Sequence, residues 1–152
     1  MRESMPERRA RGGPSGAASN PAHAGAICPA GRTDLPTERW VQDMRDKNLR
    51  DVMILLGPHP TFADPSGKTY RGRQSIRRLY SEVFKTFDSE IVMTEQTREW
   101  SQNVCIQTGT YTEDPRTRAT GAIAHYAGTF RFSYVLRPKG EWRLARQVWT
   151  AE

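Results

Sequence analysis

The spacing of apolar residues changes character at Thr37. Residues 1–36 contain five Pro, five Gly and seven Ala, and their only Ile, Leu or Val side chains are Ile27 and Leu35. Such a stretch buries too little apolar surface to offset the entropy lost when its backbone becomes ordered. From Thr37 to Glu152 the apolar positions are periodic. The pattern therefore predicts a disordered Pro/Gly/Ala-rich tail over 1–36 and one folded domain over 37–152.

Helical periodicity marks the first half of the domain. An apolar stripe predicts a first helix that begins at Thr37, the expected N-cap residue after Pro36. A second short helix is expected over 49–56, and the segment 57–60 ends it, because proline restricts the preceding residue to extended backbone. The clearest helix begins after Gly72. Its apolar side chains recur at spacings of three and four residues: Ile76, Leu79, Tyr80, Val83, Phe84 and Phe87.

Alternating apolar and polar positions predict strands in the rest of the domain. A short strand over 61–63 leads into the segment 64–67, whose Asp, Pro and Gly positions are typical of a type I turn. Four further strands follow the last helix, with hairpin turns between them: 90–100, 103–113, 119–136 and 141–150. Helices followed by an antiparallel meander predict an α+β fold, with the helices packed on one face of a strongly curved antiparallel sheet.

Composition and charge exclude several classes of function. The net charge of +6 is divided between the tail, with five positive and three negative residues, and the domain, with eighteen and fourteen. The excess is scattered and lacks the basic and aromatic interleaving of nucleic-acid readers, so no nucleic acid is expected. No run of 18 apolar residues occurs, which excludes a membrane-spanning helix. Cys28 and Cys105 stand far apart without metal-site spacing, which predicts unpaired cysteines and a cytoplasmic location.

Several short strings occur in an order that resembles a known family. They are Trp40, the polar turn 46–49, Leu55-Leu56, the strand end Phe62–Pro65, the helix start Gly72–Ile76, and the strand segments Gly109–Tyr111, Gly128–Phe130 and Gly140–Leu144. Their order resembles the nuclear transport factor 2-like superfamily, in its SnoaL-like and ketosteroid-isomerase-like branch, over residues 37–152. The resemblance implies a cone-shaped, cystatin-like fold with a pocket between sheet and helices, often in a homodimer.

The resemblance also implies a chemistry. In isomerases of this superfamily, an Asp that precedes Pro at the end of the early strand moves a proton next to a carbonyl, and Asp64 is the matching residue. Such a base needs desolvation to raise its pKa, and it needs facing donors that stabilise the enolate. The isomerase donors, a Tyr and an Asp, are matched here by Trp40 or Val41 and by Phe132 or Ser133. Phe132 has no hydrogen to donate, so steroid isomerisation itself is not expected.

Candidate pocket residues are the large rings on the predicted elements and one histidine: Trp40, Phe62, Tyr80, Phe84, Tyr111, His125, Tyr126, Phe132 and Trp149. Alternation leaves open which face of strand 119–136 lines the cone, and Gly128 is the expected place for a β-bulge. Plain core packing is the alternative role for the rings. For Asp64 the alternative is a turn-former whose carboxylate caps its own turn amides.

Two functions stay open at this point. The first is a small-molecule enzyme of the isomerase, cyclase or lyase type that acts on an apolar carbonyl compound with Asp64 as base. The second is a non-catalytic ligand-binding or homodimerising module whose cone is filled by its own aromatics. Phosphate-binding loops, nucleophile motifs and paired metal ligands do not occur in the sequence, so no cofactor and no metal are expected. The sequence decides neither the ligand nor whether the protein is an enzyme.

Overall fold

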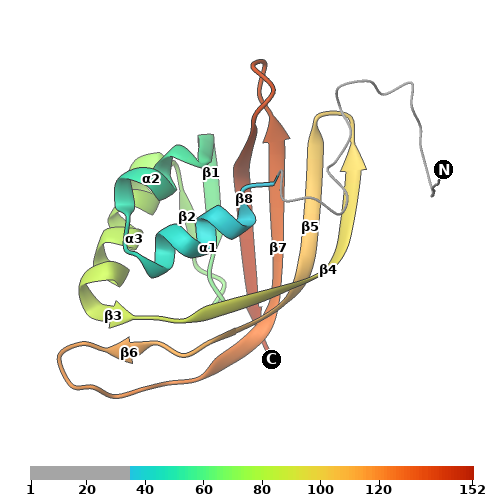
Figure 1. Cartoon of the computed structure of the whole chain (residues 1–152). Coiled ribbons are helices and arrows are strands. Elements are labelled where there is room, and N and C mark those ends of the chain that lie inside the picture. The colour runs from blue at the N-terminus through green and yellow to red at the C-terminus, as the bar shows by residue number, and fades with distance from the viewer. Residues whose placement is uncertain (1–34) are drawn as a thin grey trace.

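The structure is a computed structural model that describes residues 35–152. Three helices in this part of the chain lie together on one side of a curved sheet (Figure 1): α1 (Thr37–Arg45), α2 (Leu49–Ile54) and α3 (Arg73–Thr86). The apolar stripe of α3 packs inward as predicted, with Ile76 and Tyr80 buried. α2 is shorter than predicted, because the chain is already a strand from Leu56 onward.

The start of α1 differs from the prediction. Pro36 holds the N-cap position, and Thr37 is the first helical residue. The hydroxyl of Thr37 does not cap the helix, because it donates to Gln107 Oε1 across the core at 2.6 Å. Leu35, assigned to the predicted tail, is buried in the core. The remainder of that tail, 1–34, lies outside the described residues, so the domain boundary stays a prediction.

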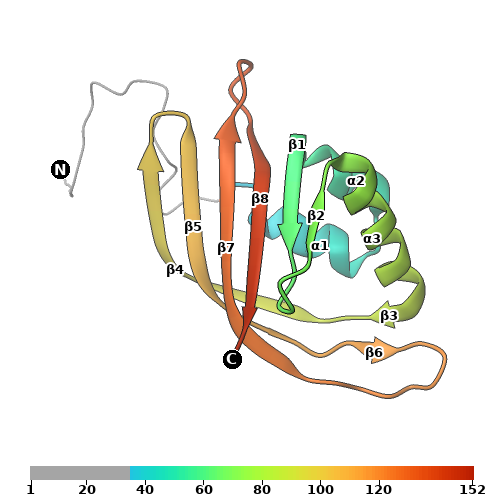
Figure 2. The same cartoon turned by 180° about the vertical axis from the view of Figure 1, so that it is seen from behind.

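Six strands form the main sheet in the order β2-β1-β8-β7-β5-β4. Their bounds are β1 (Leu56–Ala63), β2 (Thr69–Arg71), β4 (Ile91–Ser101), β5 (Val104–Glu113), β7 (Tyr126–Leu136) and β8 (Trp142–Ala151). The long strands β4, β5, β7 and β8 are antiparallel neighbours as predicted, and Figure 2 shows them from behind. β1 instead runs parallel to β8, so the sheet is mixed rather than wholly antiparallel.

β1 is longer than the predicted strand 61–63, because it takes in the proline-containing segment. Its pairing with β8 is interrupted between Leu56 and Thr61, where proline has no N–H to contribute to the ladder. After β1 the predicted reverse turn is present, with Gly67 N donating to Asp64 O at 2.9 Å. β2 then pairs antiparallel with β1. This turn places Asp64 at the junction between the two strands.

The strand predicted over 119–136 begins only at Tyr126. The chain before it forms β6 (Arg116–Thr117), which pairs with β3 (Phe87–Asp88) in a separate two-stranded sheet beside the helices (Figure 1). Asp88 forms ion pairs with Lys47 and Arg116, and the first of these joins the helical side of the domain to this short sheet. The prediction failed here because a two-residue strand held by distant charges carries no alternation of its own.

Buried and exposed side chains alternate along β7 and show which face of this strand is internal. Phe130, Phe132 and Tyr134 are buried, whereas Arg131 is exposed. The predicted bulge at Gly128 is wrong, since the register with both neighbours is regular there. Among the antiparallel pairs of the long strands, the register shifts lie instead opposite Tyr134 on β8 and within β4.

Cys105 is fully buried on β5 and is disulfide-bonded. No second cysteine occurs in 35–152, so its partner lies outside the described residues. The prediction of unpaired cysteines is therefore wrong at Cys105. Because disulfides persist mainly in oxidising compartments, this residue no longer supports the predicted cytoplasmic location.

Candidate functional site

A cavity of about 230 Å³ lies between the helices and the sheet. Its aromatic walls come from α1, β1, α3, β5 and β8: Trp40, Phe62, Tyr80, Tyr111 and Trp149. Aliphatic side chains fill the gaps between the rings: Met44, Leu79, Val83 and Ile91. Two carboxylates, those of Asp64 and Glu113, also line it. Sites for drug-sized ligands usually enclose about 300–1,000 Å³, so this aromatic cavity suits a smaller compound.

Trp149 is the centre of the aromatic walls. Its ring centroid lies 4.9 Å from that of Tyr111, 5.3 Å from that of Phe132 and 5.8 Å from that of Trp40. The first two pairs are edge-to-face, an arrangement that the quadrupoles of the rings favour over a face-to-face stack. Trp149 is only 6% exposed. Trp149 and Trp40, two of the candidate pocket residues, thus lie against each other in the cavity wall, and packing holds the walls in place.

Asp64 contributes a half-buried carboxylate to the cavity, at the turn between β1 and β2. Its Oδ1 accepts three hydrogen bonds from this turn, from Ser66 N at 2.9 Å, Ser66 Oγ at 2.6 Å and Lys68 N at 3.0 Å. Its Oδ2 accepts none from a described residue. The carboxylate is therefore held by one oxygen and open at the other.

The same hydrogen bonds set the ionisation of Asp64. Burial by itself raises the pKa of this carboxyl, but the hydrogen bonds from Ser66 and Lys68 and the charge of Lys68 together outweigh burial. The net pKa lies below the ordinary value for Asp, so the raised pKa expected of a general base is not found. Asp64 is ionised at neutral pH.

Tyr80 carries a hydroxyl that two N–H groups hold in place. Trp40 Nε1 donates to it at 3.1 Å and Gln147 Nε2 donates at 2.7 Å. Gln147 Oε1 in turn accepts from Trp149 Nε1 at 3.3 Å. Burial raises the pKa of Tyr80 to about 12, against the opposing effect of the two hydrogen bonds. This phenol is neutral at physiological pH.

Not every predicted pocket residue reaches the cavity. Phe84 lines a smaller adjoining cavity of about 50 Å³ that shares Trp40 with the main one. Phe132 is fully buried behind Trp40 and Trp149, and so belongs to the core. The predictions for His125 and Tyr126 are wrong. Tyr126 is 52% exposed, and His125 lies on the surface in contact with Asp114, because the chain before β7 leaves the sheet.

Two polar residues of the site were missed from the sequence. Glu113, at the end of β5, lines the cavity and accepts a hydrogen bond from Ser89 Oγ at 2.6 Å. Gln147 is 1% exposed and orients the groups around Tyr80. Strand alternation would have found both, since Glu113 shares a face with Tyr111 and Gln147 shares a face with Trp149.

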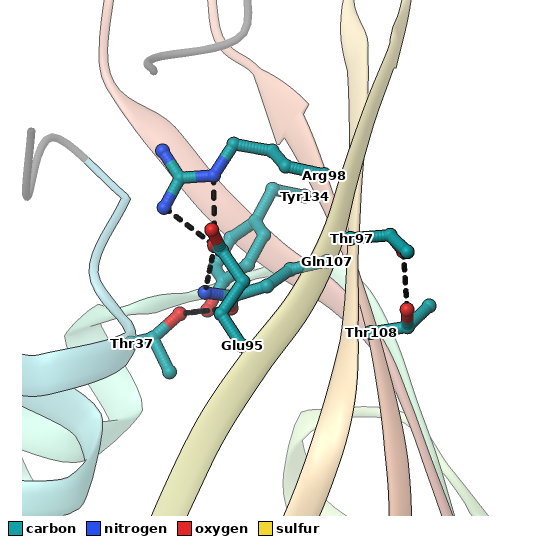
Figure 3. Close-up of polar contacts among 7 residues, drawn as sticks. All are labelled: Thr37, Glu95, Thr97, Arg98, Gln107, Thr108 and Tyr134. Carbon is teal, nitrogen blue, oxygen red and sulfur yellow. Dashed lines mark hydrogen bonds and ion pairs between the residues drawn. The ribbon is translucent and has the colours of Figure 1, made fainter. Parts of the chain in front are cut away.

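A larger cavity, of about 440 Å³, lies against another stripe of α1 and against β4. Figure 3 shows the polar cluster beside it. Glu95 accepts from Arg98 Nη2 at 2.6 Å and from Gln107 Nε2 at 2.8 Å, which leaves Gln107 Oε1 to accept from Thr37. Tyr134 then donates to Thr37, whose own hydrogen is already used. Because these groups form hydrogen bonds with one another, the cluster serves to hold α1 against the sheet. The aromatic cavity is therefore the candidate site.

Two further findings apply to residues 35–152 alone. No group of three or more His, Cys, Asp or Glu side chains in this range is arranged to hold a metal ion. No helix in the same range is long and apolar enough to cross a membrane.

No protein-family model matches the sequence, and no curated protein sequence matches it. Solved structures match it in fold. A conserved protein from Planctomyces limnophilus aligns with a TM-score of 0.71 at 17% identity, over 76% of this chain and 90% of that chain. A ketosteroid isomerase-like protein from Erwinia carotovora atroseptica gives a TM-score of 0.69 at 15% identity, over 76% and 89% of the two chains.

A nuclear transport factor 2-like superfamily protein from Salmonella enterica serovar Typhimurium gives a TM-score of 0.67 at 17% identity, over 76% of this chain and 84% of that chain. Identities this low are evidence of shared fold alone. The fold expected from the sequence is thereby confirmed: this chain has the cone-shaped α+β architecture of nuclear transport factor 2-like proteins.

Proposed function

We propose that the protein binds a small, largely apolar carbonyl compound in the aromatic cavity and moves a proton at the carbon next to the carbonyl, with Asp64 as general base. The observation that carries this proposal is the presence of an ionised carboxylate in a cavity built mainly from aromatic and aliphatic side chains. Oδ1 of Asp64 is held by three donors and Oδ2 is open. A general base requires a fixed carboxylate with a free oxygen.

The reaction needs only a base and a means of stabilising negative charge. Asp64 Oδ2 takes the proton, so that a C–H bond of the substrate breaks and an O–H bond forms on the carboxyl. The electron pair of the C–H bond delocalises onto the carbonyl oxygen and gives an enolate. Exchange of the proton on Asp64 with solvent, followed by delivery of a solvent hydrogen to the same carbon, gives hydrogen exchange. Delivery to another carbon gives isomerisation, and loss of a leaving group gives elimination.

The pKa of Asp64 narrows the substrate class. Its low value makes this carboxylate a weaker base than one raised by burial, and each pKa unit of lost basicity costs up to about 1.4 kcal/mol. The substrate C–H must be correspondingly acidic. A carbon that lies between a carbonyl and an aromatic ring or double bond meets this condition. Flat, conjugated compounds of this kind also suit walls made of Trp and Tyr rings.

The structural neighbours support the reaction class only indirectly. One of them is named as a ketosteroid isomerase-like protein. Many unrelated functions share one fold, so the proposal depends on the site itself.

A second candidate function is non-catalytic binding, in a monomer or a homodimer. The observation that favours it is the hydrogen bonding of Asp64, whose three turn contacts explain its presence without any catalysis. In that case the cavity would hold a ligand while Asp64 only shapes the rim.

Exchange of hydrogen for deuterium in 2-tetralone, a bicyclic ketone with an acidic C–H, distinguishes the two functions. The wild-type protein in D₂O is expected to accelerate loss of the C1 proton signal, followed by ¹H NMR. Asp64→Asn keeps an oxygen for the turn amides but removes the base, and a loss of about 10²-fold or more in the protein-catalysed rate is expected. Asp114→Asn is the matched control, since Asp114 also precedes Pro but lies outside the cavity.

The outcomes separate the hypotheses. Binding of 2-tetralone without accelerated exchange in the wild-type protein favours the non-catalytic function. Loss of exchange in Glu113→Gln but not in Asp64→Asn would show that Glu113, and not Asp64, is the base. Equal loss in Asp64→Asn and Asp114→Asn would point to a general effect of charge.

A further inference from the structure

The hydroxyl hydrogen of Tyr80 has no acceptor among the described residues, although the side chain is only 1% exposed. Both hydrogen bonds at this hydroxyl are donated to its oxygen, by Trp40 and by Gln147. The indole N–H of Trp40 has no lone pair to offer, so this contact has only one direction.

The direction of the Gln147 contact is set by Trp149. Because the two ends of an amide look alike, the side chain could be turned so that its oxygen faced Tyr80. Trp149 Nε1 approaches the other end at 3.3 Å, and an indole N–H only donates. The amide oxygen therefore belongs on the Trp149 side and the NH₂ group on the Tyr80 side. Turning the amide would bring two donors together and leave Trp149 unpaired.

A second buried tyrosine shows the contrast. Tyr134 is fully buried like Tyr80, but its hydrogen goes to Thr37 and the chain of donors ends on Glu95 (Figure 3). A buried donor without an acceptor costs about 1–3 kcal/mol, so natural structures seldom leave one unless it has a use. Tyr80, Trp40 and Trp149 all line the aromatic cavity, so the side chain that carries the unused hydrogen belongs to the wall that a ligand would contact.

We propose that Tyr80 is the ligand's hydrogen-bond donor: its hydroxyl hydrogen binds the carbonyl oxygen of the compound in the aromatic cavity and stabilises the enolate that forms from it. This inference rests on the proposed function. Trp40 and Gln147 act as positioning residues, because they fill the accepting directions of the phenol oxygen. Their donation also polarises the O–H bond and strengthens it as a donor. A donor that is held in place before the reaction spends no energy on reorientation as charge develops.

The ionisation of Tyr80 agrees with a donor rather than a base. With a pKa of about 12, its phenol keeps its hydrogen throughout the neutral range. Carbonyl binding is therefore expected to be unchanged between pH 6 and pH 9.

Tyr111 is the competing donor. It also lines the cavity, and its hydroxyl makes no hydrogen bond to a described residue. Without neighbours that hold its oxygen, this hydroxyl must be oriented by the ligand itself, which makes it the weaker donor. The experiment therefore has to compare the two tyrosines directly.

The test is a comparison of 2-tetralone with tetralin, which has the same rings but no carbonyl, by NMR titration. In the wild-type protein 2-tetralone should bind more tightly than tetralin. Tyr80→Phe should weaken 2-tetralone binding about tenfold and leave tetralin binding unchanged, since one hydrogen bond contributes on the order of 1.4 kcal/mol. Tyr111→Phe and Tyr134→Phe should keep the preference for the ketone.

A carbonyl-labelled probe gives a second readout that needs no variant. The carbonyl ¹³C signal of 2-tetralone bound to the wild-type protein should lie downfield of its position in an apolar solvent, as it does when a carbonyl oxygen accepts a hydrogen bond. In Tyr80→Phe the bound signal should move to the upfield position of an apolar solvent. If Tyr80→Phe does not fold, the wild-type shift still decides whether a donor meets the carbonyl, and Gln147→Leu, which removes one positioning group, should reduce that shift.

Several outcomes overturn the inference. It fails if wild-type protein shows no preference for the ketone, if the preference survives Tyr80→Phe, or if it is lost in Tyr111→Phe instead. Failure of the proposed catalysis looks different. In that case hydrogen exchange is absent, while binding and the carbonyl shift still depend on Tyr80.

Discussion

Replacing Thr37 by Val tests the chain of hydrogen bonds that joins α1 to the sheet. Valine has nearly the same shape as threonine but neither donates nor accepts. In the wild-type protein Tyr134 donates to Thr37 and Thr37 donates to Gln107. Thr37→Val therefore removes the partner of both neighbours at once. Tyr134→Phe removes only a donor to Thr37, which keeps its own bond to Gln107.

The two changes are expected to differ in cost because burial differs at the two ends. Tyr134 is fully buried and is not among the residues that line the larger cavity, so its stranded hydrogen is out of reach of the water there. Gln107 lines the larger cavity, where water can replace the lost donor. A stranded donor costs about 1–3 kcal/mol and a lost hydrogen bond about 1 kcal/mol. Thr37→Val should therefore lower the free energy of unfolding by about 3 kcal/mol, and Tyr134→Phe by about 1 kcal/mol.

The sharpest expectation concerns the double variant. Once Thr37 is Val, the buried Tyr134 hydroxyl has no acceptor and destabilises the folded state. Adding Tyr134→Phe should therefore restore about 1–2 kcal/mol of the free energy of unfolding. Urea unfolding monitored by tryptophan fluorescence measures all three variants, and an unchanged m-value shows that they are comparable. The proposed direction of these hydrogen bonds is wrong if Tyr134→Phe destabilises the protein as much as Thr37→Val, or if the double variant is less stable than Thr37→Val alone.

Two other predictions concern backbone packing and buried charge. Gly109→Ala should lower the free energy of unfolding, measured by thermal unfolding, by about 3 kcal/mol, because the new Cβ would lie 1.9 Å from the backbone oxygen of Thr94. Gly57→Ala is the matched control: the nearest atom to its new Cβ is 3.8 Å away, and the free energy of unfolding should change by less than about 1 kcal/mol. Asp43→Asn should raise the free energy of unfolding at pH 7, since burial first and the charge of Asp51 next raise the pKa of Asp43, whose Oδ2 is unpaired. A raised folded-state pKa means that stability is lost as pH rises through it, so the gain from Asp43→Asn should vanish below about pH 4; a gain that persists at pH 3 in urea unfolding would contradict this account.

Features that depend on near neighbours in the chain were predictable from the sequence. The apolar stripe of α3 needs only the helical period, and the Asp64 turn needs only four residues whose local preferences agree. The antiparallel meander follows in the same way from strands joined by short turns. Trp40 and Trp149 could be named as pocket candidates through the order of several weak motifs along the chain, and both line the cavity.

The directions of individual hydrogen atoms were not predictable, because they are decided where distant segments meet. The free hydrogen of Tyr80 exists only because α1 and β8 each bring an N–H group to α3. In the same way, Thr37 does not cap α1 because its hydroxyl donates to Gln107 on β5. His125 lies outside the pocket because the chain before β7 pairs with β3 instead of the main sheet, and its ring contacts Asp114. Periodicity along the chain was enough to predict the three helices, the long strands and several of the aromatic side chains that line the cavity, since burial follows periodicity. Which buried polar groups pair with one another depends on the tertiary fold, because each of these hydrogen bonds requires a residue that lies far away in the chain.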